Sequence, residues 1–434
     1  MSVAAVGMLG IVVLLAMLFF LGTPVAVAMA VVGFAGFAYL VSPTAALGVL
    51  STDLWEVFSN YGLTVIPTFI LMGQVAFHAG VNKRLYKVAH VWIGHIRGGI
   101  AMATVGACAA FSAICGSNTA TAATMTSVAL PEMKRYKYNP KLGTGAVAAG
   151  STLGVVIPPS VLLIVIGLNT GESIGKLFYG GFAAGAVLCL AMMLTAYVIC
   201  VRKPAWGPPG PRVAIKERLG ALPGAIEMLL LFVFVMTGLY VGFFTPSEAG
   251  ATGAFLAVAI AVVQGKLSWR GFLDALMETL VISCMVILII AGATIFSRFL
   301  AVTRIPFDIA AWVQLLPLPS WVIITFILII YAVGGCVMDG LALLLITIPI
   351  FFPVATQLGY DPIWFSVVVT VVTTLGAISP PVGVSAYVVS GMAPEVPLKE
   401  VFKGILYFIP AFVASIAIMM IFPRIITLLP SLFM

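Results

Sequence analysis

The sequence predicts an all-α polytopic membrane protein that is built from two inverted-topology repeats. Three observations lead to this fold class: an apolar composition, turn residues that recur at one fixed offset, and basic residues that gather on one side of the predicted membrane. Of the 434 residues, 62% are hydrophobic and 8% are charged, and the mean hydropathy is +1.21. A soluble chain of this length needs more charge to cover its surface, and the recurring apolar runs match membrane-spanning helices of about twenty residues.

The repeat appears when the sequence is compared with itself at an offset of 222 residues, where Thr23-Pro24 coincides with Thr245-Pro246. The other coincident residues are mainly helix breakers and turn residues: Glu56 with Glu278, Pro131 with Pro353, Tyr138-Asn139-Pro140 with Tyr360-Asp361-Pro362, Thr152-Leu153-Gly154 with Thr374-Leu375-Gly376, and Pro158-Pro159 with Pro380-Pro381. Chance similarity of apolar composition rarely aligns such residues. The prediction is a first repeat at 1–201, a linker at 202–223 and a second repeat at 224–434.

The distribution of basic residues orients the two repeats. The first repeat has basic loops at 81–98 and 132–141, whereas the corresponding segments 303–319 and 354–363 of the second hold one arginine and no lysine. Because Lys and Arg gather in cytoplasmic loops, equivalent loops of the two halves are expected on opposite faces of the membrane. This places the linker at 202–223 in the cytoplasm and both termini outside, with five spans in each half.

Two segments are too short to cross the membrane twice. Residues 98–131 start and end at loops predicted to be cytoplasmic, and their 34 residues reach about 51 Å as helix, whereas two crossings of a 30 Å core need about 60 Å. The segment is therefore predicted to be a re-entrant hairpin with its tip at Gly116-Ser117-Asn118. The corresponding hairpin, at 320–353, has its predicted tip between Gly334-Gly335 and Asp339-Gly340.

Each hairpin is followed by a predicted broken helix, at about 141–171 and about 363–394. These segments contain "GSTLGVVIPPS" and "TTLGAISPPVG", in which two successive prolines prevent regular helix. Each Pro-Pro pair alone is compatible with a kink that helps helices pack. Interrupted helices at equivalent positions of two halves, however, are typical of a transport site, because non-helical backbone persists in a bilayer only where protein or a water-filled cavity satisfies it.

The free carbonyl and hydroxyl groups of these segments suit Na⁺, and the N-termini of half-helices suit a carboxylate. The residues of one predicted Na⁺ site are Ser117, Asn118, Gly150, Thr152 and Val155, and those of its inverted counterpart are Gly335, Asp339, Thr373, Thr374 and Ile378. The residues predicted to meet an organic anion are Asn118, Thr119, Pro158, Ser379, Pro380 and Arg298.

Two of these residues have alternative roles. Asp339 either takes part in cation binding or coupling, or it pairs structurally with a helix N-terminus or a nearby arginine. Arg298 either contacts the substrate or Asp339, or it is an arginine that reaches the membrane interface.

Other function classes are less compatible with the sequence. No Gly-x-x-x-x-Gly-Lys phosphate loop is present, so an ion gradient rather than ATP is expected to supply the energy. No nucleophile is paired with a base, so the protein is not expected to be an enzyme.

The six Cys and three His show no metal-ligand spacing, so no transition metal and no cofactor besides the coupling Na⁺ is expected. The basic stretch "NKRLYKVAHVWIGHIR" predicts contact with membrane lipid rather than nucleic acid. A channel would need a continuous polar path, whereas the polar residues gather at two points.

Several stretches resemble a known family. "IPTFILMGQVAFHAG" and the following "GGIAMATVGACAAFSAICGSNTATAATM" resemble the large membrane subunit, the DctM-like M subunit, of tripartite ATP-independent periplasmic (TRAP) transporters of the ion transporter superfamily. "SNTATA", from Ser117 to Ala122, is also similar to the hairpin-tip motif of the divalent anion:sodium symporters, which share that fold. The second tip, "GCVMDGLAL", has no Ser-Asn-Thr, which favours a TRAP subunit over a stand-alone symporter that needs no binding protein.

The resemblance implies a mechanism and partners. Members of this fold are elevator-type transporters, in which two hairpins and two broken helices form a mobile transport domain inside a scaffold. TRAP large subunits act in the bacterial inner membrane with a small four-helix membrane subunit (Q type) and a soluble periplasmic substrate-binding protein. They import carboxylate-bearing solutes, such as sialic acid, C4-dicarboxylates or similar organic acids, with Na⁺. No four-helix region precedes Met1 or follows Met434, so the small subunit is expected to be a separate chain.

Overall fold

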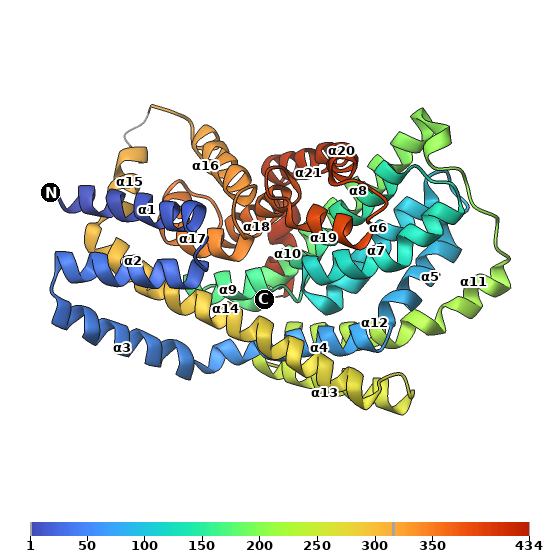
Figure 1. Ribbon diagram of the computed structural model, residues 1–434, viewed down its shortest axis with the longest axis horizontal. Coiled ribbons are helices and arrows are strands. Elements are labelled where there is room, and N and C mark those ends of the chain that lie inside the picture. The colour runs from blue at the N-terminus through green and yellow to red at the C-terminus, as the bar shows by residue number, and fades with distance from the viewer. Residues whose placement is uncertain (1, 315–316, 434) are drawn as a thin grey trace.

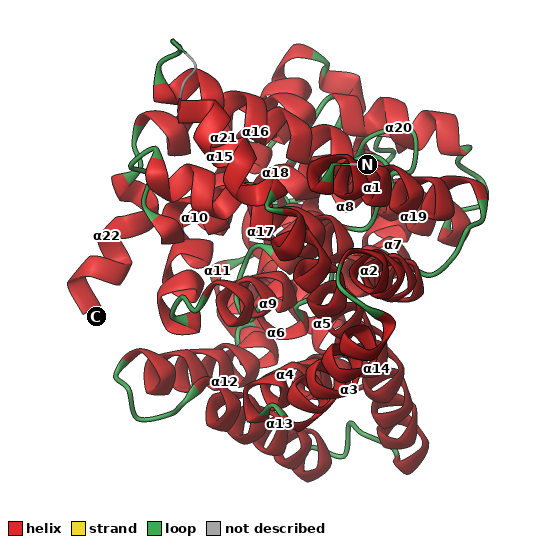
Figure 2. Cartoon of the chain, turned by 90° about the vertical axis from the view of Figure 1, so that its left-hand side faces the viewer, coloured by secondary structure: helices red, strands yellow, loops and turns green. Residues whose placement is uncertain are grey.

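The computed structural model describes residues 2–314 and 317–433, and over these residues the fold is all-α, as the sequence predicts (Figures 1 and 2). Seven helices in the described part are long and apolar enough to cross a membrane, and shorter apolar helices lie between them. The chain is therefore a multi-pass membrane protein. The inverted orientation of the two halves and the boundaries at 201 and 224 stay predictions.

The helices of the first half include the segments expected to form a hairpin and a broken helix. In chain order they are α1 (Val3–Phe20), α2 (Val25–Leu40), α3 (Pro43–Ser59), η1 (Tyr61–Thr64), α4 (Val65–His78), α5 (Val81–Ile93), α6 (Gly99–Cys115), α7 (Asn118–Arg135), α8 (Pro140–Ser151), η2 (Thr152–Val155), α9 (Val161–Thr170) and α10 (Ile174–Arg202). The segment 98–131 is thus two helices, of which the second continues to Arg135 through Pro131.

The linker and the second half follow the same plan. Their helices are η3 (Pro204–Trp206), α11 (Ile215–Ala221), α12 (Pro223–Tyr240), α13 (Pro246–Val263), α14 (Trp269–Thr303), α15 (Ile305–Gln314), α16 (Ser320–Gly335), α17 (Gly340–Gln357), α18 (Pro362–Ile378), α19 (Val384–Met392), α20 (Leu398–Leu406), α21 (Ile409–Ile421) and α22 (Arg424–Phe433). The pair α16–α17 corresponds in sequence to α6–α7, and the pair α18–α19 corresponds to α8–α9.

Local sequence determines where several of these helices begin. Thr245 caps α13, and its hydroxyl and backbone exchange hydrogen bonds with Glu248 in a capping box. Asp361 caps α18 by accepting a hydrogen bond of 2.8 Å from the Trp364 amide. Both caps are followed directly by a proline, which is favourable in the first turn because its missing N–H has no helical partner there.

Two groups of helices that border the hairpin tips lie against each other. The scaffold layer consists of α2, α3, α4, α13 and α14, which run together along one side of the molecule (Figure 1). The hairpin layer consists of α6 to α9 and α16 to α19. The two groups meet where α4 contacts α6 and where α14 contacts α17, so the hairpins are packed against the scaffold layer.

Glycines allow very close approach within the scaffold layer. A Cβ atom at Gly292 of α14 would lie 2.3 Å from the backbone oxygen of Ala26 on α2, and one at Gly33 would lie 2.8 Å from backbone atoms of Phe296. Backbone atoms cannot rotate aside as a flexible side chain can, so a methyl group at either position would push the two helices apart. Van der Waals contact of this kind, rather than the hydrophobic effect, holds helices together in lipid.

We expect Gly292→Ala to lower the thermal unfolding midpoint of the purified protein by several degrees, because inserting a methyl group into a close contact costs about 1–3 kcal/mol. The matched control is Gly48→Ala on α3, where a Cβ meets no atom within 4 Å. Replacement of an unhindered helical glycine by alanine stabilises a helix by up to about 1 kcal/mol. An unchanged midpoint in Gly292→Ala would contradict the close packing of α2 on α14.

Candidate functional site

The first hairpin tip is a short non-helical turn. α6 ends at Cys115 and α7 begins at Asn118, and Gly116 between them has a positive φ of 62°, a conformation that glycine adopts without strain. Ser117 caps α7, because its hydroxyl accepts a hydrogen bond from the Ala120 amide at 3.4 Å. The predicted tip at Gly116-Ser117-Asn118 is where the structure places the turn.

The second tip has the same plan with a different cap. α16 ends at Gly335, and Asp339 caps α17 by accepting a hydrogen bond of 2.9 Å from the Leu341 amide. Asp339 therefore pairs with a helix N-terminus, which is one of the two roles predicted for it. The other carboxylate oxygen of Asp339 has no hydrogen bond among the described residues, so it stays available to a ligand.

The helix after each hairpin is interrupted. α8 passes into η2, which ends at Val155, and α9 begins only after the Pro158-Pro159 pair. Ser160 stabilises this break, since its hydroxyl donates a hydrogen bond of 2.5 Å to the Val155 carbonyl and accepts one of 3.3 Å from the Leu163 amide. In the second half, Pro380-Pro381 lies between α18 and α19, and both Pro-Pro bonds are cis.

Each tip packs on the break of its own half through a glycine at the matching position. A Cβ at Gly154 would lie 2.6 Å from the Ser117 carbonyl oxygen, and one at Gly376 would lie 2.3 Å from the carbonyl carbon of Gly335. The amide of Val382 also donates a hydrogen bond of 3.1 Å to the carbonyl of Cys336. Only a residue without a side chain permits this contact, so tip and break are held together as one unit in each half.

The two tips and the two breaks surround one cavity of about 210 Å³, which we call the tip cavity. Seven of the residues predicted for the three sites line it: Ser117, Asn118, Thr119, Val155, Asp339, Thr373 and Thr374. Residues that are more than two hundred positions apart in sequence are therefore brought to one point. The two predicted Na⁺ sites and the predicted anion site border the same cavity.

The remaining predicted residues are Gly150, Thr152, Gly335, Ile378, Pro158, Ser379, Pro380 and Arg298, which the structure places outside the cavity lining. Gly150 faces Cys108, and the buried Thr152 hydroxyl donates a hydrogen bond of 2.7 Å to the Ala149 carbonyl. The prolines and Ser379 form the breaks behind the cavity wall. Apart from Arg298, these residues are close neighbours in sequence of residues that line the cavity.

Helix ends and the carboxylate of Asp339 are the main charged groups at the tip cavity. Four helices begin there, since the lining includes their first residues: Asn118 of α7, Val161 of α9, Gly340 of α17 and Val384 of α19. The N-terminus of a helix leaves N–H groups unpaired and carries about half a positive charge. α6, η2 and α18 end beside the cavity, since Cys115, Val155 and Ala377 line it. Within the described residues no Lys, Arg or His lines the cavity, so an anion there would be held by amides and hydroxyls.

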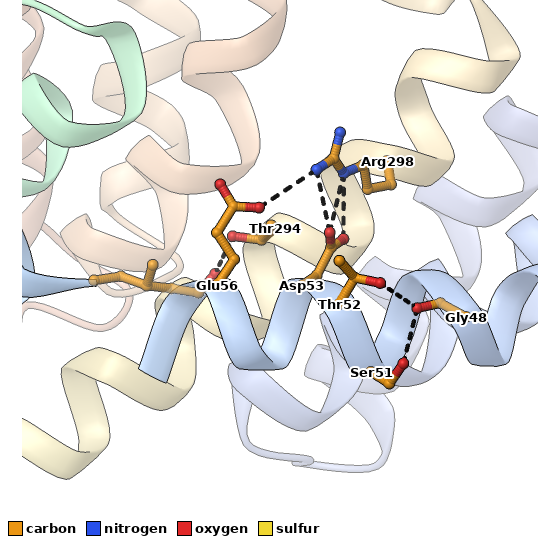
Figure 3. A network of polar contacts seen from close by, with 8 residues as sticks. Gly48, Ser51, Thr52, Asp53, Glu56, Thr294 and Arg298 are labelled. Atoms are coloured by element: carbon orange, nitrogen blue, oxygen red, sulfur yellow. Dashed lines mark hydrogen bonds and ion pairs between the residues drawn. The ribbon is translucent and has the colours of Figure 1, made fainter. Parts of the chain in front are cut away.

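Arg298, which was predicted to contact the organic anion, lies outside the tip cavity. Its guanidinium is 3.2 and 3.3 Å from the carboxylate of Asp53 on α3, and 3.8 Å from Glu56 one turn later (Figure 3). Asp53 is 2% exposed, whereas the Arg298 side chain is half exposed and lines a separate cavity of about 520 Å³. Arg298 therefore contacts neither Asp339 nor the tip cavity, and its ion pair joins α3 to α14 within the scaffold layer.

The sequence analysis did not identify two residues that contribute to the Arg298 ion pair and to the tip cavity. The first is Asp53, whose carboxylate in an apolar region signals the need for a basic partner, although nothing in the sequence indicates which one. The second is Gln74 of α4, which lines the tip cavity from the scaffold layer. Its signal is a single amide within the apolar stretch "IPTFILMGQVAF".

Comparison with known proteins first gives the class of fold. The crystal structure of the YdaH transporter from Alcanivorax borkumensis, described as having an unusual topology, is similar with a TM-score of 0.64. The similarity covers 87% of this chain and 89% of that one at 15% sequence identity, which shows the fold alone.

The family follows from the sequence comparisons. Residues 12–425 match the model of the DctM component of tripartite ATP-independent periplasmic transporters, so the chain belongs to that family. It is 36% identical to the C4-dicarboxylate TRAP transporter large permease protein DctM of Pseudomonas aeruginosa, over 88% of this chain and 89% of that protein. It is 31% identical to the sialic acid TRAP transporter large permease protein SiaM of Vibrio cholerae, over 86% and 87%. The resemblance noted from the motifs is confirmed, and these relatives are transporter permeases rather than enzymes.

We expect Asp53→Asn to destabilise the protein by roughly 1.5–3 kcal/mol, because the carboxylate charge that strengthens the hydrogen bonds from Arg298 is lost. Glu56→Gln is the matched control on the same helix, since Glu56 is exposed and contacts the same guanidinium only at 3.8 Å. Exposed pairs of this kind contribute about 0–1 kcal/mol. Equal thermal unfolding midpoints of the two variants would show that the Asp53–Arg298 pair does not join α3 to α14.

Proposed function

We propose that this chain is the large membrane subunit of a Na⁺-coupled importer of a carboxylate-bearing solute, and that the tip cavity is the solute site. The observation that carries the proposal is the convergence of four helix N-termini on a cavity whose described lining holds no basic side chain. Such an arrangement attracts a carboxylate through fixed N–H groups, and it releases the carboxylate more easily than a paired guanidinium does.

We propose that the coupling ion binds where the helices that precede the tips and breaks end. The C-terminal carbonyls of α6, η2 and α18, together with the free oxygen of Asp339 and the hydroxyls of Ser117 and Thr374, are hard oxygen ligands that suit Na⁺. A cation bound there would orient the same backbone segments whose N–H groups meet the solute. Na⁺ and the solute therefore raise each other's affinity.

The proposed movement is an elevator motion of the hairpin layer along the scaffold layer. Four of the five tip-cavity residues on the scaffold side are apolar: Ile70, Ile282, Met285 and Val286. An apolar wall makes few directional contacts, so the tips can move past it at low cost. The proposed location is the bacterial inner membrane, with both termini in the periplasm.

The proposed partners are those of a tripartite system: a small four-helix membrane subunit and a soluble periplasmic binding protein that delivers the solute. Membership in the DctM family supports them. The alternative is a stand-alone symporter, to which the Ser117-Asn118-Thr119 tip is also similar.

The two functions are separated by uptake into proteoliposomes that contain this chain and its small subunit. Labelled succinate and sialic acid are supplied under an inward Na⁺ gradient, with and without the binding protein. Uptake that needs both Na⁺ and the binding protein supports the tripartite function. Uptake with Na⁺ alone supports the symporter, and uptake that is indifferent to Na⁺ refutes the proposed coupling.

We expect Ser117→Ala and Thr374→Ala to raise the Na⁺ concentration for half-maximal uptake about tenfold, which corresponds to 1.4 kcal/mol for one lost oxygen ligand. The controls are Ser127→Ala on α7 and Thr370→Ala on α18. Their hydroxyls donate to the carbonyls of Thr124 and Ser366, and neither residue lines the tip cavity. Wild-type Na⁺ dependence in both cavity variants would disprove the assigned sites.

A further inference from the structure

Gln74 is a buried amide that lacks an internal partner. Its side chain is 5% exposed and lines the tip cavity, and no hydrogen bond joins it to any described residue. Its amide atoms are not among the fully buried unpaired atoms of the described residues, so they are open to the cavity, and most such polar groups in native proteins have a partner. The missing partner of Gln74 is therefore expected to be something that enters the cavity.

The position of Gln74 gives it a role that the tip residues do not have. Among the described residues that the scaffold layer contributes to the cavity, Gln74 is the only polar one, and its neighbours Ile70, Ile282, Met285 and Val286 are apolar. The helix N-termini and hydroxyls belong to the hairpin layer. A solute in the cavity thus meets polar groups of the hairpin layer and, across apolar side chains, one amide of the scaffold layer.

The arrangement of polar groups in the cavity matches a particular kind of solute. The polar groups of the hairpin layer and the Gln74 amide of the scaffold layer are separated by apolar side chains. A short dicarboxylate likewise has a polar group at each end and an apolar spacer between them.

We propose that Gln74 determines specificity by donating a hydrogen bond from its amide to the second carboxylate of a four-carbon dicarboxylate, whose first carboxylate is held by the helix N-termini of the tips. This inference rests on the proposed function of the tip cavity and adds the substrate class and the scaffold contact. A neutral amide suits this position because a hydrogen bond to a charged group is worth about 1.5–3 kcal/mol. Such a contact selects a solute, yet it can break when the hairpin layer moves away from α4.

The test compares a four-carbon dicarboxylate with a four-carbon monocarboxylate. The complex of this chain with its small subunit is placed in lipid nanodiscs, and the dissociation constants of labelled succinate and butyrate are measured at saturating Na⁺. Gln74→Leu removes the amide and keeps the approximate volume. We expect it to weaken succinate binding about 10- to 100-fold, following the energy of the lost hydrogen bond, and to change butyrate binding less than twofold.

Two further variants make the test specific. Met72→Leu, on the same helix as Gln74 but outside the cavity lining, conserves volume and is expected to leave both dissociation constants unchanged. Gln74→Glu adds a charge of the same sign as the solute and is expected to weaken succinate binding more than Gln74→Leu does. The Na⁺ concentration for half-maximal succinate binding should stay at the wild-type value in Met72→Leu, which confirms that the cation sites are intact.

Each other outcome overturns a defined part of the proposal. Equal weakening of succinate and butyrate in Gln74→Leu would make Gln74 a structural residue, and no weakening of either would remove it from the solute site. Wild-type binding of sialic acid without binding of succinate would refute the substrate class. If the wild-type complex binds none of these acids, while Na⁺-driven uptake with the binding protein is also absent, the proposed function itself fails.

Discussion

The structure depends on one constraint: a backbone that leaves the helical conformation inside a membrane must have its polar groups satisfied by protein or by a ligand. The two tips and the two breaks satisfy this constraint by lying against each other. Gly154 and Gly376, at matching positions, permit the backbone of a break to touch the backbone of a tip. The N–H and carbonyl groups that remain free then face one small cavity, where a ligand can satisfy them.

The same constraint explains how charge is distributed. A basic side chain in the tip cavity would pair with Asp339 or bind an anion tightly, and none is found in its described lining. Arg298 is instead held by Asp53 in the scaffold layer, where its ion pair joins two helices. The positive charge of Arg298 thus belongs to the scaffold layer, whereas the proposed solute site offers an anion only the partial charges of helix N-termini.

The sequence predicts the tips and breaks well because each leaves a signal that needs no knowledge of contacts. The length of 98–131 limits how far the chain can reach, and Pro158-Pro159 and Pro380-Pro381 prevent regular helix. It predicts less well what depends on distant pairing. The roles predicted for Arg298 were inferred from its position near the end of a predicted span. Asp53 was not recognised as its partner, because 245 positions separate the two residues. Gln74 is not selected either, since a lone amide becomes informative only when the structure shows what it faces.

The length of α14 has a consequence for how this protein responds to its surroundings. Its 35 residues extend about 52 Å, well beyond a hydrocarbon core of roughly 30 Å. The helix must therefore tilt or project from the lipid, and the degree of tilt depends on bilayer thickness. Because Ile282, Met285 and Val286 stand midway along this unbroken rod, a thinner or thicker bilayer shifts one wall of the solute cavity. On the proposed function, lipid composition thus becomes a determinant of solute affinity.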